Sequence, residues 1–303
     1  MGVDNITYRG RFAPTPSGPL HFGSLVAATA SYLEARSRGG MWHLRIDDLD
    51  PPRVMPGAVD SILRCLEALG FEWDGTVAYQ SNRRDAYHAA FHRLQRLGVV
   101  FPCTCTRKEI ADSAISRNIE SLVYPGTCRK SLPPGHSARA WRLNVQGMLV
   151  DFDDGLLGPQ HRELERAVGD FILYRADGVY AFHLASAVDD GEHGITDVVR
   201  GADLLESSAC QVQLLGLLAL PIPHYVHLPV AVNGRGEKLS KQTRATPIDP
   251  TRPLVALAAV LHFLNQGIPD DICEATAPEF WQYAIEHWDL RRVGHRLRAL
   301  APS

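Results

Sequence analysis

The sequence has no long apolar run, few cysteines and almost no excess of charge. Hydrophobic residues make up 45% of its 303 residues, yet no uninterrupted apolar stretch approaches the ~20 residues of a membrane-spanning helix. Six cysteines are too few for a disulfide-rich secreted scaffold. The formal net charge of −3 argues against a general nucleic-acid coat, although it leaves room for a local basic face.

Targeting signals and repeats are also absent. Residues 1–4 lack the basic region and apolar core that open a signal peptide, and no internal repeat or low-complexity tract follows. We therefore expect a cytoplasmic enzyme without a membrane partner. Paired basic residues at 83–84, 107–108, 129–130 and 291–292 are candidates for a basic face, although solvated surface charge explains each of them more simply.

The most informative stretch that is present lies near the N-terminus. Residues 14–19, Pro-Thr-Pro-Ser-Gly-Pro, form a stiff turn that continues neither a strand nor a helix. His21 and Gly23 follow and lead into residues 24–30, which read as a helix. A helix N-terminus presents free N–H groups and partial positive charge to phosphate. An ordinary strand-to-helix connection with a surface histidine is the alternative.

A second motif stands more than two hundred residues later, in the segment Lys238-Leu239-Ser240-Lys241-Gln242. An apolar run at 226–232 and a polar, glycine-bearing stretch at 233–237 precede it, which predicts a strand that runs into a loop. Two lysines three positions apart on a loop can close over a triphosphate and stabilise the charge that develops as pyrophosphate leaves. A solvated lysine pair is the alternative.

Together the two motifs resemble the HIGH and KMSKS signatures of class I aminoacyl-tRNA synthetases. Ser24 replaces the second histidine of the first signature, while Leu239 and Gln242 replace the methionine and the final serine of the second. The resemblance implies an α/β fold with a Rossmann-like catalytic core and ATP with Mg²⁺ as a substrate. It also implies catalytic roles for His21, Lys238 and Lys241, and ATP contacts from His21, Gly23, Ser24 and Lys241.

Four further stretches, at 11–18, 43–53, 79–81 and 188–205, resemble the glutamyl branch of that class. A buried carboxylate needs a charge-assisted partner, which arginine supplies with fixed geometry. The resemblance implies that Arg11 and Arg200 hold the carboxylates of L-glutamate and that Asp47 meets its ammonium group. The implied glutamate-binding residues are Arg11, Phe12, Ala13, Pro14, Thr15, Asp47, Phe182 and Arg200.

Two of these positions depart from the family pattern. Asp47 stands where the family usually has glutamate, so its contact with the ammonium group can shift or include a bridging water. Phe182 stands where the family tends to have tyrosine, and it cannot donate a hydrogen bond. His183 or Tyr180 can compensate for the lost donor.

Three cysteines, Cys103, Cys105 and Cys128, fall within one short stretch. Thiolates serve well in a tetrahedral zinc site, which needs a fourth ligand. The resemblance implies Tyr124, four residues before the last cysteine, whereas His136 is the fallback on chemistry alone. We expect one structural Zn²⁺ per chain at Cys103, Cys105, Tyr124 and Cys128. Free cytosolic thiols are the alternative.

Strand and helix signals alternate along the chain. Strands are expected at 10–14, 43–46 and 226–232, and helices at 17–38, 57–69, 83–97, 162–171, 254–264 and from 278 to about 300. Gly70 and Gly98 are expected to end two of these helices. We expect the first half of the catalytic core at 1–100, an insertion with the zinc site at 101–190, the second half of the core at 191–250 and a short helical C-terminal tail at 251–303.

Only about 60 residues follow Lys241. A glutamyl-tRNA synthetase carries a long anticodon-binding region there, so the short tail resembles the glutamyl-queuosine tRNA(Asp) synthetase family instead. That resemblance implies activation of glutamate by ATP and its transfer to queuosine in the anticodon of tRNA(Asp), by a protein that we expect to be a monomer. Charging of a tRNA 3′ end, a nucleotidyltransferase with a HIGH-type motif and an inactive paralogue are the alternatives.

Overall fold

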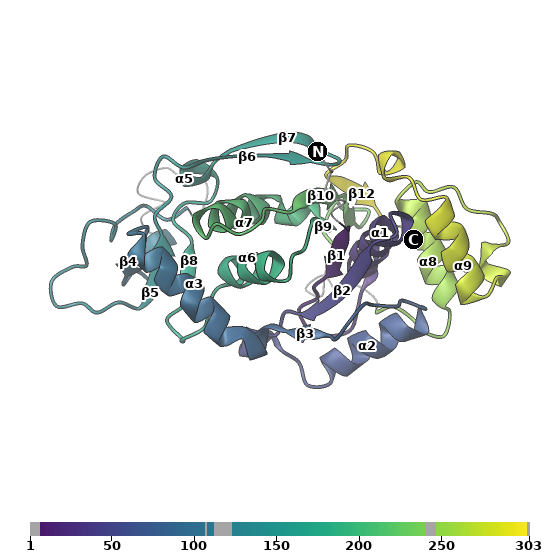
Figure 1. Cartoon of the computed structure of the whole chain (residues 1–303), viewed down its shortest axis with the longest axis horizontal. Coiled ribbons are helices and arrows are strands. Elements are labelled where there is room, and N and C mark those ends of the chain that lie inside the picture. The colour runs from purple at the N-terminus through teal and green to yellow at the C-terminus, as the bar shows by residue number, and fades with distance from the viewer. Residues whose placement is uncertain (1–6, 107, 112–122, 240–246, 302–303) are drawn as a thin grey trace.

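The computed structural model describes residues 7–106, 108–111, 123–239 and 247–301. Parallel strands form the centre of an α/β fold (Figure 1). One sheet has the order β1-β2-β3 and the other β7-β6-β10-β9, and hydrogen bonds between Arg9 and Thr196 hold the start of β1 beside the start of β9. The strands are β1 (Arg9–Phe12), β2 (Met41–Ile46), β3 (Ala78–Tyr79), β6 (Leu149–Asp154), β7 (Gly158–Glu163), β9 (Asp197–Gly201) and β10 (His224–Leu228).

Helices cover these strands, and the last two of them form one end of the molecule (Figure 1). The helices are α1 (Phe22–Ser37), α2 (Ala58–Ala68), α3 (Arg84–Arg96), α5 (Leu164–Ala167), α6 (Phe182–Glu192), α7 (Leu205–Leu217), α8 (Pro253–Phe263) and α9 (Ala277–Glu286). Short 3-10 turns are η1 (Pro51–Arg53), η2 (Gln80–Arg83), η3 (Ala202–Leu204), η5 (Ile272–Glu274) and η6 (Leu290–Val293). Within the described ranges, no helix combines the length and apolar content needed to cross a bilayer.

The loop before α1 sets the position of that helix. Gly18 adopts φ 130°, a conformation that an L side chain rarely accepts, and His21 caps the helix. The buried face of α1, which includes Leu25 and Leu33, packs in one core with strand residues and with α8 and α9. Helix α1 is thus fixed over β1 and β9, and its N-terminus lies near their carboxyl ends.

A third, antiparallel sheet lies at the opposite end of the molecule from α8 and α9 (Figure 1). It has the order β4-β5-β8, with β4 (Val100–Cys103), β5 (Ala140–Leu143) and β8 (Ile172–Tyr174). Cys103, Tyr124 and Cys128 form a small apolar cluster of their own beside it, separate from the two larger cores.

Most of the predicted elements are confirmed. Strands and helices occupy the expected places at 10–14, 43–46, 57–69, 83–97 and 254–264, with shifts of a few residues at the ends. Gly70 and Gly98 adopt φ values of 76° and 71° just beyond α2 and α3, as helix-ending glycines do. The helix expected from residue 17 begins at Phe22, because the proline-rich turn occupies residues 14–19.

Three predictions were wrong. The strand expected at 226–232 is two strands, β10 and β11 (Val230–Val232), because Pro229 lacks an N–H for the ladder. The helix expected at 162–171 shrinks to α5, since residues up to Glu163 pair in β7 with β6 and Gly169, at φ 73°, stands just beyond its end. The tail expected to be helical to about residue 300 ends instead in β12 (Arg298–Leu300), which pairs in parallel with β11.

Candidate active site

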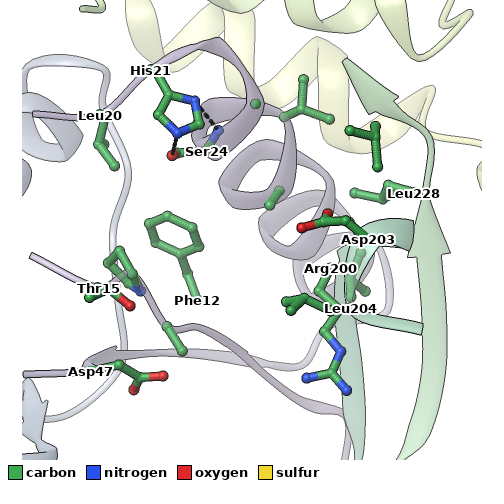
Figure 2. Close-up of a pocket in the computed structure, with 18 of the residues that line it drawn as sticks. Phe12, Thr15, Leu20, His21, Ser24, Asp47, Arg200, Asp203, Leu204 and Leu228 are labelled. Atoms are coloured by element: carbon green, nitrogen blue, oxygen red, sulfur yellow. Dashed lines mark hydrogen bonds between the residues drawn. The ribbon is translucent and has the colours of Figure 1, made fainter. Parts of the chain in front are cut away.

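A cavity of about 770 Å³ opens at the carboxyl ends of β1 and β9 and at the start of α1. The two sheets meet between these strands, which is where ligands bind in open α/β folds. Figure 2 shows His21 and Ser24 at one end of the cavity, Asp47 and Arg200 at the other, and Phe12 between them.

His21 is fixed at the first end by two hydrogen bonds to Ser24. Its Nδ1 accepts from the backbone N of Ser24 at 3.3 Å, so Nε2 carries the proton and donates to the Ser24 hydroxyl at 3.2 Å (Figure 2). The N-terminus of α1 opens beside this ring. This end of the cavity therefore offers the helix-terminal environment that phosphate groups favour.

The segment with the two lysines reaches the same end. A Cβ atom on Gly23 would lie 3.5 Å from the carbonyl oxygen of Leu239, so the backbones of the two motifs are close neighbours. The Lys238 ammonium group forms an ion pair with Asp203 at 2.5 Å on the cavity wall. Ser240, Lys241 and Gln242 lie outside the described residues.

Arg11 and Arg45 are neutralised at the other end. Asp190 accepts two bonds from Arg11, both at 3.1 Å, and one from Arg45 at 2.6 Å. Burial alone would raise the pKa of Asp190, but the two guanidinium groups hold it well below its usual range. We call Arg11, Arg45, Asp47, Asp189 and Asp190 the aspartate–arginine cluster.

Asp47 belongs to this cluster and lines the cavity. Its two oxygens accept from Arg45 at 2.7 and 3.4 Å. Burial nevertheless raises the pKa of Asp47 to about 6, against the attraction of Arg45, and the neighbouring Asp189 carboxylate adds to the rise. Arg45 also pairs with Asp190 and, at 3.7 Å, with Asp189. Asp47 is therefore an anion at neutral pH that loses its charge in mild acid.

Arg200 has no such neutralisation. It is 5% exposed, and among the described residues no carboxylate lies within ion-pair distance of it. Its Nη2 donates to the Ser208 hydroxyl at 2.5 Å, while Nε has no hydrogen-bond partner in the described structure. Burial lowers the pKa of Arg200 to about 10, so the side chain remains a cation. A buried cation without a counter-ion is costly, which indicates a site for an anionic ligand.

A second cavity of about 540 Å³ adjoins the first and shares Thr15, Asp47, Arg53 and Phe182 with it. Phe182 is 39% exposed, as befits a side chain between two cavities. Tyr180 and His183, the residues expected to compensate for Phe182, line the second cavity and are absent from the first cavity's wall as described. Burial lowers the pKa of His183 to about 4, so its imidazole is neutral.

The three cysteines of the short stretch at 103–128 meet in the fold. The sulfurs of Cys103, Cys105 and Cys128 all lie within 4.8 Å of one another. The Tyr124 hydroxyl oxygen lies 3.4 Å from the Cys103 sulfur and 3.7 Å from the Cys105 sulfur. Ligands about 2.3 Å from a tetrahedral zinc ion would lie about 3.8 Å apart, so these four donors fit the ion. His136 is exposed, and its Nδ1 lies 3.2 Å from the Pro134 carbonyl oxygen.

One cavity thus brings together nearly all the residues predicted for glutamate and ATP. They are Arg11, Phe12, Ala13, Pro14, Thr15, Asp47, Phe182 and Arg200, with His21, Gly23, Ser24 and Lys238. The sequence reasoning missed Arg45 and Asp190 as members of the site. The signal was a charged residue inside the apolar strand at 41–46 and an aspartate pair inside the helix at 182–192.

Comparisons with known proteins identify the family of the chain. The family model described as tRNA synthetases class I (E and Q), catalytic domain, matches residues 7–250. The chain is 54% identical over 296 residues to a glutamyl-Q tRNA(Asp) synthetase of Aromatoleum aromaticum, covering 98% of this chain and 93% of that protein. It is 52% identical over 303 residues to one of Dechloromonas aromatica, covering 99% and 100%.

A crystal structure of a glutamate tRNA ligase from Elizabethkingia meningosepticum, in complex with its amino acid, is similar with a TM-score of 0.79. The two sequences are 26% identical, and the alignment covers 98% of this chain and 67% of that one. The fold is therefore that of a class I aminoacyl-tRNA synthetase catalytic core. Within that class, the chain belongs to the glutamyl-Q tRNA(Asp) synthetase family.

Proposed function

We propose that this chain uses ATP to convert glutamate into glutamyl-adenylate and then transfers the glutamyl group to queuosine in tRNA(Asp). The observation that carries the proposal is Arg200, a buried cation without a carboxylate partner in the described structure, across the cavity from the carboxylate of Asp47. Glutamate complements both residues, because it carries carboxylates that can meet Arg200 and an ammonium group that can meet Asp47. The activity named for the relatives supports the tRNA(Asp) acceptor.

In the first step the α-carboxylate oxygen of glutamate attacks the α-phosphorus of ATP, and the bond to pyrophosphate breaks. Catalysis of this kind depends on positioning and charge stabilisation. His21, Gly23 and Ser24 at the start of α1 face the phosphates in this proposal. Lys238 would leave Asp203 and bind phosphate oxygens. Lys241 would stabilise the same negative charge on the phosphates. Mg²⁺ arrives with ATP as part of the substrate.

In the second step a hydroxyl of queuosine attacks the acyl carbon and AMP leaves. The adjoining cavity supports this step, because it shares Asp47 and Phe182 with the glutamate end and gives an acceptor a route to it. We propose that the protein acts as a monomer, as expected from the family resemblance. We infer a cytoplasmic location from the substrates, ATP and tRNA.

We also propose one structural zinc ion held by Cys103, Cys105, Cys128 and Tyr124. Zinc would cross-link β4 to the segment around Cys128, which has few other apolar contacts. Arg142 supports thiolate ligands at this place, since its Nε donates to the Cys103 sulfur at 3.3 Å. The cysteines lie outside the wall of the ATP-end cavity as described, so the ion has a structural role in this proposal.

The function is tested by incubating the protein with ATP, labelled glutamate and total tRNA, with and without queuosine. Glutamate-dependent pyrophosphate exchange without tRNA and label in the tRNA(Asp) anticodon only when queuosine is present are expected. Label at a tRNA 3′ end would establish ordinary charging instead. Exchange that does not depend on an amino acid would indicate a nucleotidyltransferase, and no ATP turnover an inactive paralogue.

The zinc site is tested by elemental analysis of protein purified without chelator, with one zinc per chain expected. Tyr124→Phe should weaken zinc retention during dialysis against chelator, whereas His136→Ala should not. Reversed results would make His136 the fourth ligand. Protein without metal that retains its fold and activity would overturn the site altogether.

A further inference from the structure

Three buried residues that the proposed chemistry does not use lie behind Arg200. They are Ser208 on α7, His227 on β10 and Asp154 at the end of β6, and their side chains are buried almost completely. We call them the Arg200 network. Polar groups in a core of this kind are costly unless they are fully paired, so their presence calls for an explanation.

The network is a continuous series of short hydrogen bonds. Arg200 Nη2 lies 2.5 Å from the Ser208 hydroxyl oxygen, and that oxygen lies 2.6 Å from His227 Nε2. His227 Nδ1 lies 2.6 Å from an oxygen of Asp154. The sheet builds this series directly, because His227 is the register partner of Arg200 and Asp154 ends the strand on the other side of β10.

The chemistry of the groups gives each hydrogen bond a direction. Asp154 also accepts from the backbone N–H groups of Leu156 and Leu157, at 3.0 and 2.8 Å, so it is an ionised acceptor and His227 Nδ1 must donate to it. The neutral imidazole then offers its Nε2 lone pair to the Ser208 hydroxyl. The single proton of the Ser208 hydroxyl has two acceptors within reach, His227 Nε2 at 2.6 Å and the Leu204 carbonyl oxygen at 3.1 Å, and we assign it to the nearer one. Ser208 then accepts from Arg200, which can only donate.

We propose that Ser208, His227 and Asp154 are positioning residues that orient the Arg200 guanidinium toward the substrate carboxylate without neutralising it. The negative charge lies at Asp154, two neutral groups away from Arg200, so the cation stays available to a ligand. Arg200 lines the wall of the first cavity, so a carboxylate bound there can meet its guanidinium group. A carboxylate in direct contact would orient Arg200 equally well but would compete with the substrate. This inference rests on the proposed glutamate site.

The test is Ser208→Ala, which removes the central hydroxyl and adds no bulk. The KM for glutamate in pyrophosphate exchange should rise at least about tenfold, while the KM for ATP stays within about twofold, because a lost bond to a charged group typically has an effect of that size. The rise in melting temperature that saturating glutamate gives should shrink in parallel. Asp154→Asn should have a smaller effect, since His227 then donates from Nε2 and competes with Arg200 for Ser208.

Thr29→Val is the matched control, because the Thr29 hydroxyl is equally buried, has no partner in the described structure and lies outside both cavity walls as described. It should leave both KM values unchanged. A Ser208→Ala protein with an unchanged glutamate KM, or with equal increases for glutamate and ATP, would overturn the positioning role. A wild-type protein without glutamate-dependent exchange would overturn the proposed function itself, so the two failures are distinguishable.

A second pair of variants serves if Ser208→Ala does not fold. His227→Gln keeps an acceptor toward Ser208, whereas His227→Asn loses it. We expect a higher KM for glutamate in the Asn variant than in the Gln variant, and equal values would overturn the inference.

Discussion

Two arginines line the same cavity, but carboxylates balance the charge of only one of them. Arg11 belongs to a cluster in which carboxylates meet guanidinium groups at 2.6–3.1 Å, so its charge is already balanced. Arg200 is held by a serine hydroxyl, and Asp154, the nearest anion of its network, stands two neutral groups behind it. Both side chains are buried to the same extent, at 5% exposure. Burial alone therefore does not make an arginine a binding site for an anion. Arg200 can bind one because its partners are neutral and leave its charge unbalanced.

The comparison predicts the largest effect for Arg200→Leu. This change removes the unbalanced cation and leaves a substrate carboxylate unpaired in a buried site, a loss of about 2–5 kcal/mol. The KM for glutamate in pyrophosphate exchange should rise by at least about thirtyfold. Arg200→Lys should recover only part of the affinity, because lysine cannot make a bidentate contact. An unchanged KM would mean that the balanced Arg11 is the main carboxylate partner.

The second prediction concerns stability and the balanced cluster. Asp190→Asn removes the carboxylate shared by Arg11 and Arg45. Arg45 keeps Asp47, but Arg11 becomes a buried cation without a carboxylate, at a cost of about 3–5 kcal/mol in the free energy of unfolding. Denaturant titration measures the loss. The matched control is Glu163→Gln, which breaks the exposed pair with Arg166 and should cost less than about 1 kcal/mol. Equal costs for the two variants would show that the cluster is not held by its charges.

The third prediction uses the pKa of Asp47, which burial raises to about 6. The carboxylate is charged above this pH and protonated below it, so its attraction for the substrate ammonium group is lost as the pH falls. The KM for glutamate should therefore rise between pH 7 and pH 5, and the pH profile should bend near 6. Asp47→Asn should raise the KM at pH 7.5 and remove the bend. A bend that persists in this variant would belong to another group.

The smallest effect is expected for Phe182→Tyr, which restores the residue type that the family resemblance implies. The new hydroxyl would stand between the two cavities and could add one hydrogen bond, typically about 0.5–1.5 kcal/mol. The KM for glutamate should fall by about two- to tenfold. An increase would show that the apolar ring is itself part of the fit.

The parts of the site that could be predicted are local in sequence. The turn at 14–19, the histidine cap and the helix-ending glycines depend on residue types within a few positions of one another. The pairings within the aspartate–arginine cluster could not be predicted, because Asp190 lies 179 positions from Arg11 and 145 from Arg45. The helix expected at 162–171 failed for a related reason: pairing of β7 with β6 outweighs the local apolar pattern.

The family resemblance named the charged residues that meet the substrate, but it did not show which of them are already paired with an opposite charge in the protein. Residue type alone does not distinguish a balanced arginine from an unbalanced one. That difference depends on His227 and Asp154, which lie 73 positions apart and meet only when β10 pairs with β6. The cysteine cluster is a contact between β4 and a later loop. Its three members could be grouped from the sequence only because they fall in one stretch.

The close approach of Gly23 to Leu239 has a consequence for how freely the two motifs can vary. The atom that Leu239 presents to Gly23 is its backbone carbonyl oxygen, which every amino acid possesses. Its side chain packs with the apolar core, so any residue of similar size and apolar character satisfies that place. In a library of variants, position 239 should accept methionine and isoleucine readily. Position 23 should accept alanine, because a Cβ there would lie 3.4 Å from the His21 ring, but larger side chains should crowd that ring and the Leu239 backbone. The leucine that stands here in place of the usual KMSKS methionine therefore leaves the contact between the two motifs unchanged.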